Sequence, residues 1–235
     1  MTEEDILALL ALQHTPNIGD ITAKKLIAHC GSPTAIYKEK KHKIAHIERI
    51  GSTILQHLFD PIHRVAAEKE WQYIQDNHFS YHTFFDADYP ANLKQIIDAP
   101  IIFFSRGNID LKNKKTLSIV GTRQITTYGK AFCEKFVEEL SPLEDLVIIS
   151  GFAYGVDIAA HKAAMDNGLQ TIACLAHGLD IIYPASHKKY TKEVEAYGGF
   201  ITEFWHQSSF DRKNFIGRNR IIAGLSDATV VIESA

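Results

Sequence analysis

Residues 147–161 constrain the fold of this chain more than any other stretch of its sequence. They read VIISGFAYGVDIAAH, an apolar β-branched run that stops at Ser150–Gly151 and is followed by a second glycine, Gly155. From Val156 onward the apolar residues take on helical spacing. The pattern predicts a strand, a tight glycine turn and a helix N-terminus, which together form a site for an anionic phosphate.

Similar units recur on both sides of this stretch. Short apolar runs predict strands, and the segments of about a dozen residues between them predict helices. The expected strands are 78–86, 101–105, 116–120, 146–150, 171–176, 200–203 and 229–232, and the expected helices are 129–140, 156–167, 187–197 and 219–225. Fully apolar strands that alternate with helices indicate an α/β fold, with a parallel sheet covered by helices on both faces.

The N-terminal part of the chain has a different, helical pattern. We expect residues 1–78 to form a small helical domain and residues 79–235 to form the α/β domain. A loop with Gly19 separates expected helices near 6–11 and 22–29. A hairpin of this kind can place backbone N–H groups against a nucleic-acid phosphate, whereas a plain helical bundle with a glycine turn explains the same residues. Both interpretations stay open.

Composition limits the classes to which the protein can belong. The 235 residues are 46% hydrophobic, which suits a folded protein, and their net charge is −3. A generally basic nucleic-acid-binding surface is thereby excluded, so any polyanion site must be a local cluster. No apolar run approaches the roughly 20 residues of a membrane helix, and the acidic N-terminus does not resemble a signal peptide. Cys30, Cys133 and Cys174 lie far apart and predict buried thiols in a reducing cytoplasm.

The loops that follow the expected strands are where a ligand would meet the sheet. Ligands of parallel sheets bind beyond the carboxyl ends of the strands. Arg123 follows one strand, the Ser150–Gly151 turn follows the next, and Glu203 follows a later one. The guanidinium of Arg123 suits a phosphate because its fork donates two parallel hydrogen bonds. Taken singly, a glycine turn after a strand is more often a structural feature than a ligand-binding one.

Candidate catalytic residues are few. Asp157 and His161 share one face of an expected helix, where they can form an acid–base dyad or a structural hydrogen bond. Glu203 could act as a general base, but the sequence lacks a nucleophile motif such as Gly-x-Ser-x-Gly. The His and Cys residues have no metal-ligand spacing. The residues alone therefore indicate no metal site and leave a catalytic role for Glu203 open.

A local basic cluster precedes the last expected helix. Its basic residues are Arg212, Lys213, Arg218 and Arg220. Phe215 lies among them, in a polar stretch that leads into the helix. Arginines can hold phosphates while a phenyl ring stacks on a base, the combination expected for single-stranded nucleic acid. A buried Phe215 with the arginines in a solvated face or in salt bridges explains the cluster equally well, and both interpretations stay open.

With these motifs assembled, the chain resembles the bacterial DNA-processing protein A family, also called Smf. The resemblance spans about residues 80–235, and the region before it looks like the family's helical, SAM-like domain. The resembling motifs are Gly121-Thr-Arg123 with Tyr128-Gly129, Ser150-Gly-x-Ala-x-Gly-Val-Asp157 with His161, Gly178-Leu-Asp180 with Tyr183-Pro184, and Phe215-x-x-Arg218-Asn219-Arg220-Ile-Ile-Ala-Gly-Leu-Ser226.

The resemblance implies an extended Rossmann-like domain that binds single-stranded DNA without catalysis. Family members receive incoming single strands during natural transformation, protect them and load the RecA recombinase onto them, usually as dimers. The DNA-binding residues that the motifs imply are Arg123, Ser150, Gly151, Gly155, Arg212, Lys213, Phe215, Arg218, Asn219 and Arg220. Phe215 is implied to stack on a base, and Arg218 and Arg220 to hold backbone phosphates.

The chain departs from the family pattern in two places. It ends at Ala235, where the family continues through a glycine–serine-rich loop, further strands and often a winged-helix domain. We therefore expect the sheet edge and the surfaces for the dimer and RecA to be incomplete. Ala185 stands where the family often has a lysine, and we expect Lys188 or Lys189 to substitute for it.

Two enzymatic alternatives remain. A Rossmann-like nucleotide phosphoribohydrolase would use Glu203 as acid/base and hold the nucleotide phosphate at the glycine turn, but its Pro-Gly-Gly-x-Gly-Thr signature is absent. A dinucleotide-dependent oxidoreductase fits less well, because the glycine spacing is Gly-x-x-x-Gly and the ribose-binding acid is missing.

Overall fold

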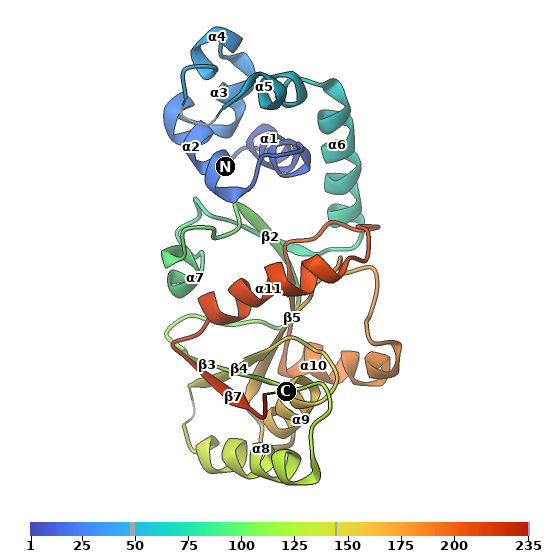
Figure 1. Ribbon diagram of the computed structural model, residues 1–235. Helices are drawn as coiled ribbons and strands as arrows, with labels where there is room; N and C mark the ends of the chain where they lie inside the picture. The colour runs from blue at the N-terminus through green and yellow to red at the C-terminus, as the bar shows by residue number, and fades with distance from the viewer. Residues whose placement is uncertain (48–49, 144, 235) are drawn as a thin grey trace. The chain divides into compact units, whose positions relative to one another are not determined.

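The computed structural model describes residues 1–47, 50–143 and 145–234 (Figure 1). The chain divides into two compact units. The first is formed by Met1–Phe79, Thr83–Phe85 and Ile97–Ile102, and the second by Ser80–His82, Asp86–Ile96 and Phe103–Ala235. The predicted division into domains 1–78 and 79–235 stays a prediction, as does the SAM-like character of the helical part.

The first unit is built from helices around the buried α1. Its helices are α1 (Glu3–His14), α2 (Asp20–Cys30), α3 (Pro33–Lys38), α4 (Lys41–Ile44), α5 (Ser52–Leu58) and α6 (Pro61–Asp76). Thr2 starts α1 with a capping box, because its side chain accepts from the backbone N–H of Asp5 while the Asp5 carboxylate accepts from that of Thr2. The two predicted helices near the N-terminus lie within α1 and α2, and Gly19 is the N-cap of α2. Contact between this helix start and phosphate stays a prediction.

The described residues of the α/β region form a seven-stranded sheet. Its strands are β1 (Ser80–Thr83), β2 (Ile102–Gly107), β3 (Lys115–Gly121), β4 (Leu146–Ser150), β5 (Gln170–Cys174), β6 (Gly198–Thr202) and β7 (Ala228–Ile232), in the order β1-β2-β6-β5-β4-β3-β7. The strands from β6 to β7 in that order are parallel, whereas β2 runs antiparallel to β6. The sheet is therefore mixed, a feature that apolar periodicity cannot reveal because it carries no strand direction.

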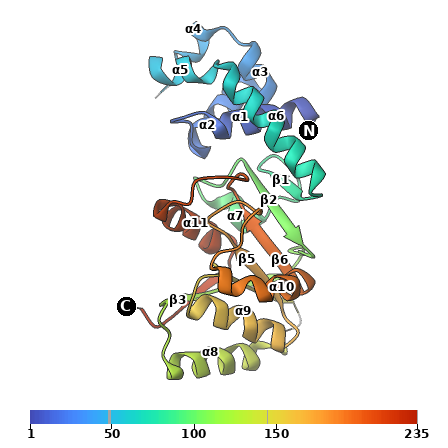
Figure 2. The same cartoon turned by 90° about the vertical axis from the view of Figure 1, so that its right-hand side faces the viewer.

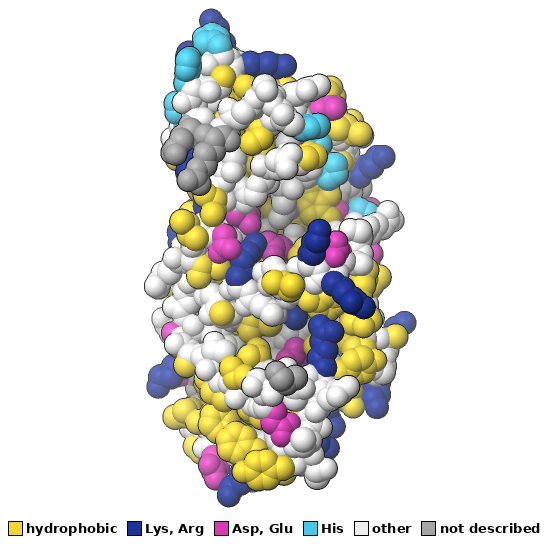
Figure 3. All heavy atoms as spheres, in the orientation of Figure 1, with side chains coloured by type: hydrophobic (Ala, Val, Ile, Leu, Met, Phe, Trp, Pro, Cys, Tyr) yellow, Lys and Arg dark blue, Asp and Glu magenta, His cyan; other side chains and the backbone are white. Residues whose placement is uncertain are grey.

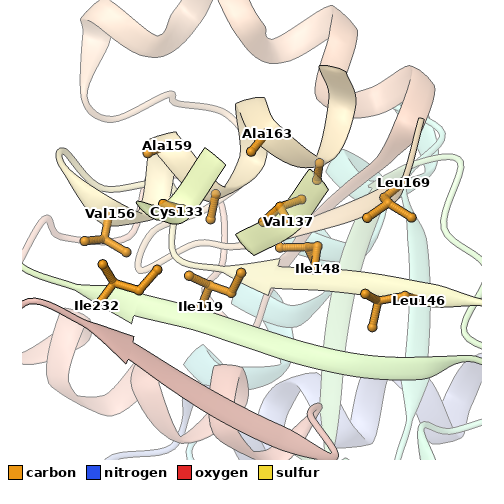
Figure 4. Close-up of a cluster of buried hydrophobic side chains, with 12 residues drawn as sticks. Ile119, Cys133, Val137, Leu146, Ile148, Val156, Ala159, Ala163, Leu169 and Ile232 are labelled. Carbon is orange, nitrogen blue, oxygen red and sulfur yellow. The ribbon is translucent and has the colours of Figure 1, made fainter. Parts of the chain in front are cut away.

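Helices cover both faces of this sheet, as predicted for the α/β class. The helices are α7 (Ala91–Gln95), α8 (Thr127–Leu140), α9 (Val156–Asp166), the 3₁₀ helix η1 (Ala185–Tyr190), α10 (Thr191–Tyr197) and α11 (Arg212–Gly224). Figure 2 shows α8, α9 and α10 on one face and α11 on the other. In Figure 4, side chains of α8 and α9 point onto β3 and β4, where Ile119 and Ile148 are fully buried. Ala159 and Ala163 belong to the same buried cluster, and their small side chains let neighbouring elements approach α9 closely.

Helix α11 begins seven residues before the predicted start at Asn219. Asp211 is its N-cap, and the Asp211 carboxylate accepts a hydrogen bond from the backbone N–H of Lys213. Gly217 interrupts the helical pattern in the sequence, which hid this first part of the helix. Phe215 and Arg218 consequently lie three residues apart on a helix, not in the polar stretch that the sequence predicted.

The three cysteines, all within the described residues, are free, and Cys133 and Cys174 are buried. Cys30 is only half-buried, so the prediction of buried thiols holds for Cys133 and Cys174 and is wrong for Cys30. None of the helices in the described part of the chain combines the length and apolar character needed to cross a membrane.

Candidate nucleic-acid interface

A cavity of about 400 Å³ lies where β3 ends, between β3, β7 and α11. We call it the α11 hollow. Four of the predicted site residues line it, namely Arg123, Phe215, Arg218 and Asn219. Figure 3 shows Lys and Arg side chains gathered where α11 begins, with hydrophobic side chains beside them. The fold therefore brings the loop after β3 and the basic cluster to one side of the sheet edge, as expected for parallel strands.

Aromatic rings form one wall beside this cavity. The guanidinium carbon of Arg123 lies 5.2 Å from the centroid of the Phe215 ring, a cation–π contact. The Phe215 ring also lies 5.3 Å from that of Phe210 and 5.9 Å from that of Tyr183. Phe210 is 48% exposed and Tyr183 is 40% exposed, so the group offers open ring surface. The sequence analysis missed Phe210, although it lies only five residues before Phe215 in the same basic stretch.

Arg218 points into the protein. It is 4% exposed, and its guanidinium donates to the backbone carbonyl of Gly151 at 2.7 Å and to that of Cys174. A Cβ on Gly151 would lie 2.5 Å from a guanidinium nitrogen of Arg218 and 2.6 Å from a carboxylate oxygen of Asp157. The glycine turn is thus filled by these two side chains. Contact of Arg218 or Gly151 with phosphate stays a prediction, and the role that the geometry gives Arg218 is to fasten the turn to α11 and β5.

Burial affects the ionisation of Asp157 beside this turn. It raises the pKa of Asp157, an effect that the positive charge of Arg218 opposes. The Asp157 carboxylate accepts from the backbone N–H of Ala153 at 3.2 Å, which closes the turn from the helix side. The nearby Ser150 is fully buried, and its hydroxyl donates to the carbonyl of Ile119 at 2.6 Å. Ser150 is therefore bound to β3, and its predicted contact with DNA stays a prediction.

The exposed members of the predicted site are Arg123, Arg212, Lys213 and Asn219. Arg220 instead forms an ion pair with Glu203 at 2.5 Å, with both side chains mostly buried. The ion pair occupies the carboxylate of Glu203, the group considered as a general base, and gives both residues a structural role. Lys188 and Lys189 both lie exposed on η1, and their substitution for the missing lysine stays a prediction.

Gly155 positions the Arg123 loop. Its φ of +76° and ψ of −123° are open to glycine but strained for other residues. A Cβ at this position would lie 2.1 Å from the carbonyl oxygen of Thr122. The backbone N–H of Val156 donates to that same carbonyl at 3.1 Å. The glycine thus lets the loop that carries Arg123 pack directly on the start of α9.

Asp157 and His161 bind different partners in the structure. The Thr171 hydroxyl donates to the carbonyl of Ile148, so the Nδ1–H of His161 donates to the Thr171 oxygen at 2.7 Å. His161 is fully buried, which lowers its pKa to about 3. These contacts favour the structural interpretation of the two residues over an acid–base dyad. No cluster of three or more His, Cys, Asp or Glu among the described residues is arranged to hold a metal ion.

The buried His161 makes a pH dependence of stability predictable. Folding keeps the imidazole neutral down to about pH 3, whereas the unfolded chain binds a proton below about pH 6.5. The unfolded state then holds the extra proton, so stability falls as the pH is lowered through this window, by up to about 1.4 kcal/mol per pH unit. We expect His161→Gln to remove this part of the slope.

Urea unfolding at several pH values between about 7 and about 4.5 measures that slope. A control variant at an exposed histidine, His29→Gln, reports the effect of losing an imidazole that is not buried. Equal slopes for the wild type and His161→Gln would contradict the prediction.

Comparison with known proteins places the chain in a family. Residues 80–235 match the family model of DNA recombination-mediator protein A. The chain is 38% identical over 149 residues to the DNA processing protein DprA of Streptococcus pneumoniae, covering 63% of this chain and 52% of that protein. It is 29% identical over 229 residues to protein Smf of Synechocystis, covering 96% of this chain and 57% of that one. The chain thus spans about half the length of the curated relatives that it matches.

Solved structures of DNA processing protein A also match this chain. The X-ray structure of DprA from Streptococcus pneumoniae superposes with a TM-score of 0.82 at 29% identity, covering 100% of this chain and 78% of that one. A structure of DNA processing protein A from Helicobacter pylori, described for its unique single-stranded DNA binding mode, gives a TM-score of 0.58 at 30% identity, covering 67% and 71% of the two chains. With more than half of its residues matched by the family model, this chain belongs to the DNA recombination-mediator protein A family.

Proposed function

We propose that this chain binds single-stranded DNA at the α11 hollow. The observation that carries the proposal is the contact of Arg123 with the Phe215 ring, 5.2 Å from guanidinium carbon to centroid, beside the open rings of Phe210 and Tyr183. These rings meet edge to face, and a cation beside a cluster of partly exposed aromatic rings can bind a phosphate and an adjacent base together. The Helicobacter pylori relative, described for its single-stranded DNA binding mode, supports the same ligand.

The residues divide into two roles under this proposal. The exposed Arg123, Arg212 and Lys213 contact backbone phosphates, while Phe215 and its neighbouring rings stack on bases. The buried Arg218 holds the glycine turn and acts through position, not through contact with the strand. Sequence preference is then expected to be weak, because every base has a face on which a ring can stack.

We also propose that the binding is non-catalytic, with no cofactor. Glu203, the residue that a phosphoribohydrolase would use, is held in an ion pair with Arg220. The Gly151 turn that would cradle a nucleotide phosphate holds the Arg218 guanidinium instead. Incubation with nucleoside monophosphates tests the alternative, since release of free base would favour the hydrolase.

The cellular role that we propose for the whole protein follows its family. It protects incoming single strands during natural transformation and loads the RecA recombinase onto them, as a homodimer in the cytoplasm. The membership of the chain in the family supports this proposal. A pull-down of RecA with the protein bound to single-stranded DNA tests the partner, and the mass in solution tests the dimer.

Fluorescence anisotropy with a labelled oligothymidylate at several salt concentrations tests the binding site. Phe215→Ala is expected to weaken binding by about 1–3 kcal/mol, roughly five- to 150-fold, through lost stacking. Arg123→Ala is expected to lower the slope of log K against log salt by about 0.7, one phosphate contact. Phe132→Ala, a 46% exposed ring on α8, is the matched control and should bind as the wild type does. An affinity that changes neither in the two site variants nor with salt concentration would overturn the proposal.

A further inference from the structure

A second cavity, of about 310 Å³, lies between the starts of α8 and α9 and the 3₁₀ helix η1. We call it the lysine hollow, because each of these three elements contributes a lysine to its lining. The lysines are Lys130 from α8, Lys162 from α9 and Lys189 from η1. None of the described residues that line it is acidic. In a chain whose net charge is −3, this is a local concentration of positive charge.

Two of the three lysines of this hollow lie over one aromatic ring. The Nζ of Lys162 lies 5.7 Å from the centroid of the Tyr190 ring, and the Nζ of Lys189 lies 5.0 Å from it. Lys130 lies 3.6 Å from Glu134, one turn further along α8, and both of these side chains are more than half exposed. Two ammonium groups beside one ring repel each other, and an anion bound between them removes that repulsion.

Neutral hydrogen-bonding groups complete the lining of the hollow. The Ser186 hydroxyl contributes to it and donates to the Tyr154 hydroxyl at 3.4 Å. Tyr154 belongs to the glycine turn itself and is 46% exposed. Lysines, hydroxyl groups and an aromatic ring are the side chains that single-strand-binding grooves combine along a sugar–phosphate backbone.

The ridge between the lysine hollow and the α11 hollow is thin. Gly155 lines the lysine hollow, and a Cβ placed on it would lie 2.1 Å from the Thr122 carbonyl oxygen and 2.7 Å from the Arg123 carbonyl carbon. The same loop sends Arg123 into the α11 hollow and Ile125 into the lysine hollow. The main chain at Gly155 therefore packs directly against the main chain of Thr122 and Arg123, and this contact lies between residues that line the two cavities.

We propose that the lysine hollow binds backbone phosphates of the same DNA strand, which crosses the ridge at Arg123 and Gly155. The inference rests on the proposed function and extends it, because it assigns the strand a path beyond the α11 hollow. It adds three lysine–phosphate contacts that the motifs of the sequence did not indicate.

The experiment compares two triple variants of equal charge. The first, which we call the hollow variant, combines Lys130→Gln, Lys162→Gln and Lys189→Gln. The control is Lys112→Gln with Lys115→Gln and Lys135→Gln, which includes a lysine with the same helical pairing, Lys135 to Glu139 at 3.6 Å, and two exposed lysines at the opposite end of β3. Oligothymidylates of about 4 to about 16 nucleotides are titrated by fluorescence anisotropy over a range of salt concentrations.

For the long oligonucleotides, the hollow variant is expected to lower the salt slope by about 2, since each single-strand phosphate contact contributes about 0.7. For the shortest oligonucleotides, which fit within the α11 hollow, it should bind as the control does. A long-oligonucleotide slope equal to that of the control overturns the inference while leaving the proposed function intact, provided that Phe215→Ala still weakens binding. Failure of the wild type to bind any oligonucleotide overturns both.

Inorganic phosphate separates a strand site from a site for small anions. If the hollow takes the strand, phosphate at low millimolar concentration should shift the thermal midpoint of the wild type and of the hollow variant equally. A stabilisation confined to the wild type, together with affinities that do not depend on oligonucleotide length, would show a free-anion site and overturn the inference.

Discussion

Replacing Arg218 with methionine is expected to lower the free energy of unfolding by about 3–5 kcal/mol. The substitution removes the hydrogen bonds to the carbonyls of Gly151 and Cys174, both of which are buried, and leaves Asp157 without its neighbouring positive charge. Methionine approximates the volume of the aliphatic part of the side chain, so lost polar contacts dominate over lost packing. Urea denaturation monitored by circular dichroism measures the change.

The control for this variant is Arg212→Met, at the exposed first residue of α11. We expect it to change stability by about 0.5 kcal/mol or less, as surface substitutions do. Combining Arg218→Met with Asp157→Asn should recover part of the loss, because the neutral amide no longer leaves a buried charge uncompensated. An Arg218→Met protein that is as stable as the wild type but fails to bind DNA would contradict the structural role and support direct contact with phosphate.

Gly155→Ala is expected to destabilise the fold by several kcal/mol. The backbone conformation of Gly155 costs about 1–3 kcal/mol for a residue with a side chain. The added Cβ also meets main-chain atoms of Thr122 and Arg123, which cannot swing away as a flexible side chain does, and overpacking of this kind costs about 1–3 kcal/mol more. Because the loop must move, we expect single-strand affinity to fall as well, at protein concentrations and temperatures where the variant is still folded.

Gly217→Ala provides the matched control within the same region. Gly217 lies inside α11, and nothing lies within 4 Å of a Cβ placed on it. Alanine at a helical position is better than glycine by roughly 0.5–1 kcal/mol, so this variant should be more stable than the wild type. Thermal unfolding of both variants measures the contrast, and a Gly155→Ala protein with an unchanged midpoint would refute the proposed packing of the loop.

The fold class was readable from the sequence because the parallel strands and their helices follow strong periodic patterns. The run before Ser150 predicts β4 with its bounds, and the apolar positions from Val156 predict α9. The antiparallel direction of β2 was not readable, since pairing direction depends on how distant segments meet. The start of α11 was missed because Gly217 weakens the local helical pattern, even though Asp211 supplies a good cap.

The candidate site was readable as a set of residues but not as a geometry. A motif shows that Arg218, Asn219 and Arg220 follow one another, but not which side chain points inward. Successive side chains of a helix point about 100° apart. Arg218 is therefore buried although the next residue, Asn219, is exposed. Phe210 was missed for a related reason, since its contact with Tyr183 joins segments that the sequence separates.

The glycine turn after β4 is held from three sides. Arg218 donates to the carbonyl of Gly151, His187 to that of Phe152, and the backbone N–H of Ala153 donates to Asp157. A turn fixed in this way does not reorganise when a ligand arrives, so it contributes little loss of conformational entropy to binding. The loss of conformational entropy on association must then come mainly from the flexible nucleic-acid strand, whose backbone adapts to a rigid protein edge.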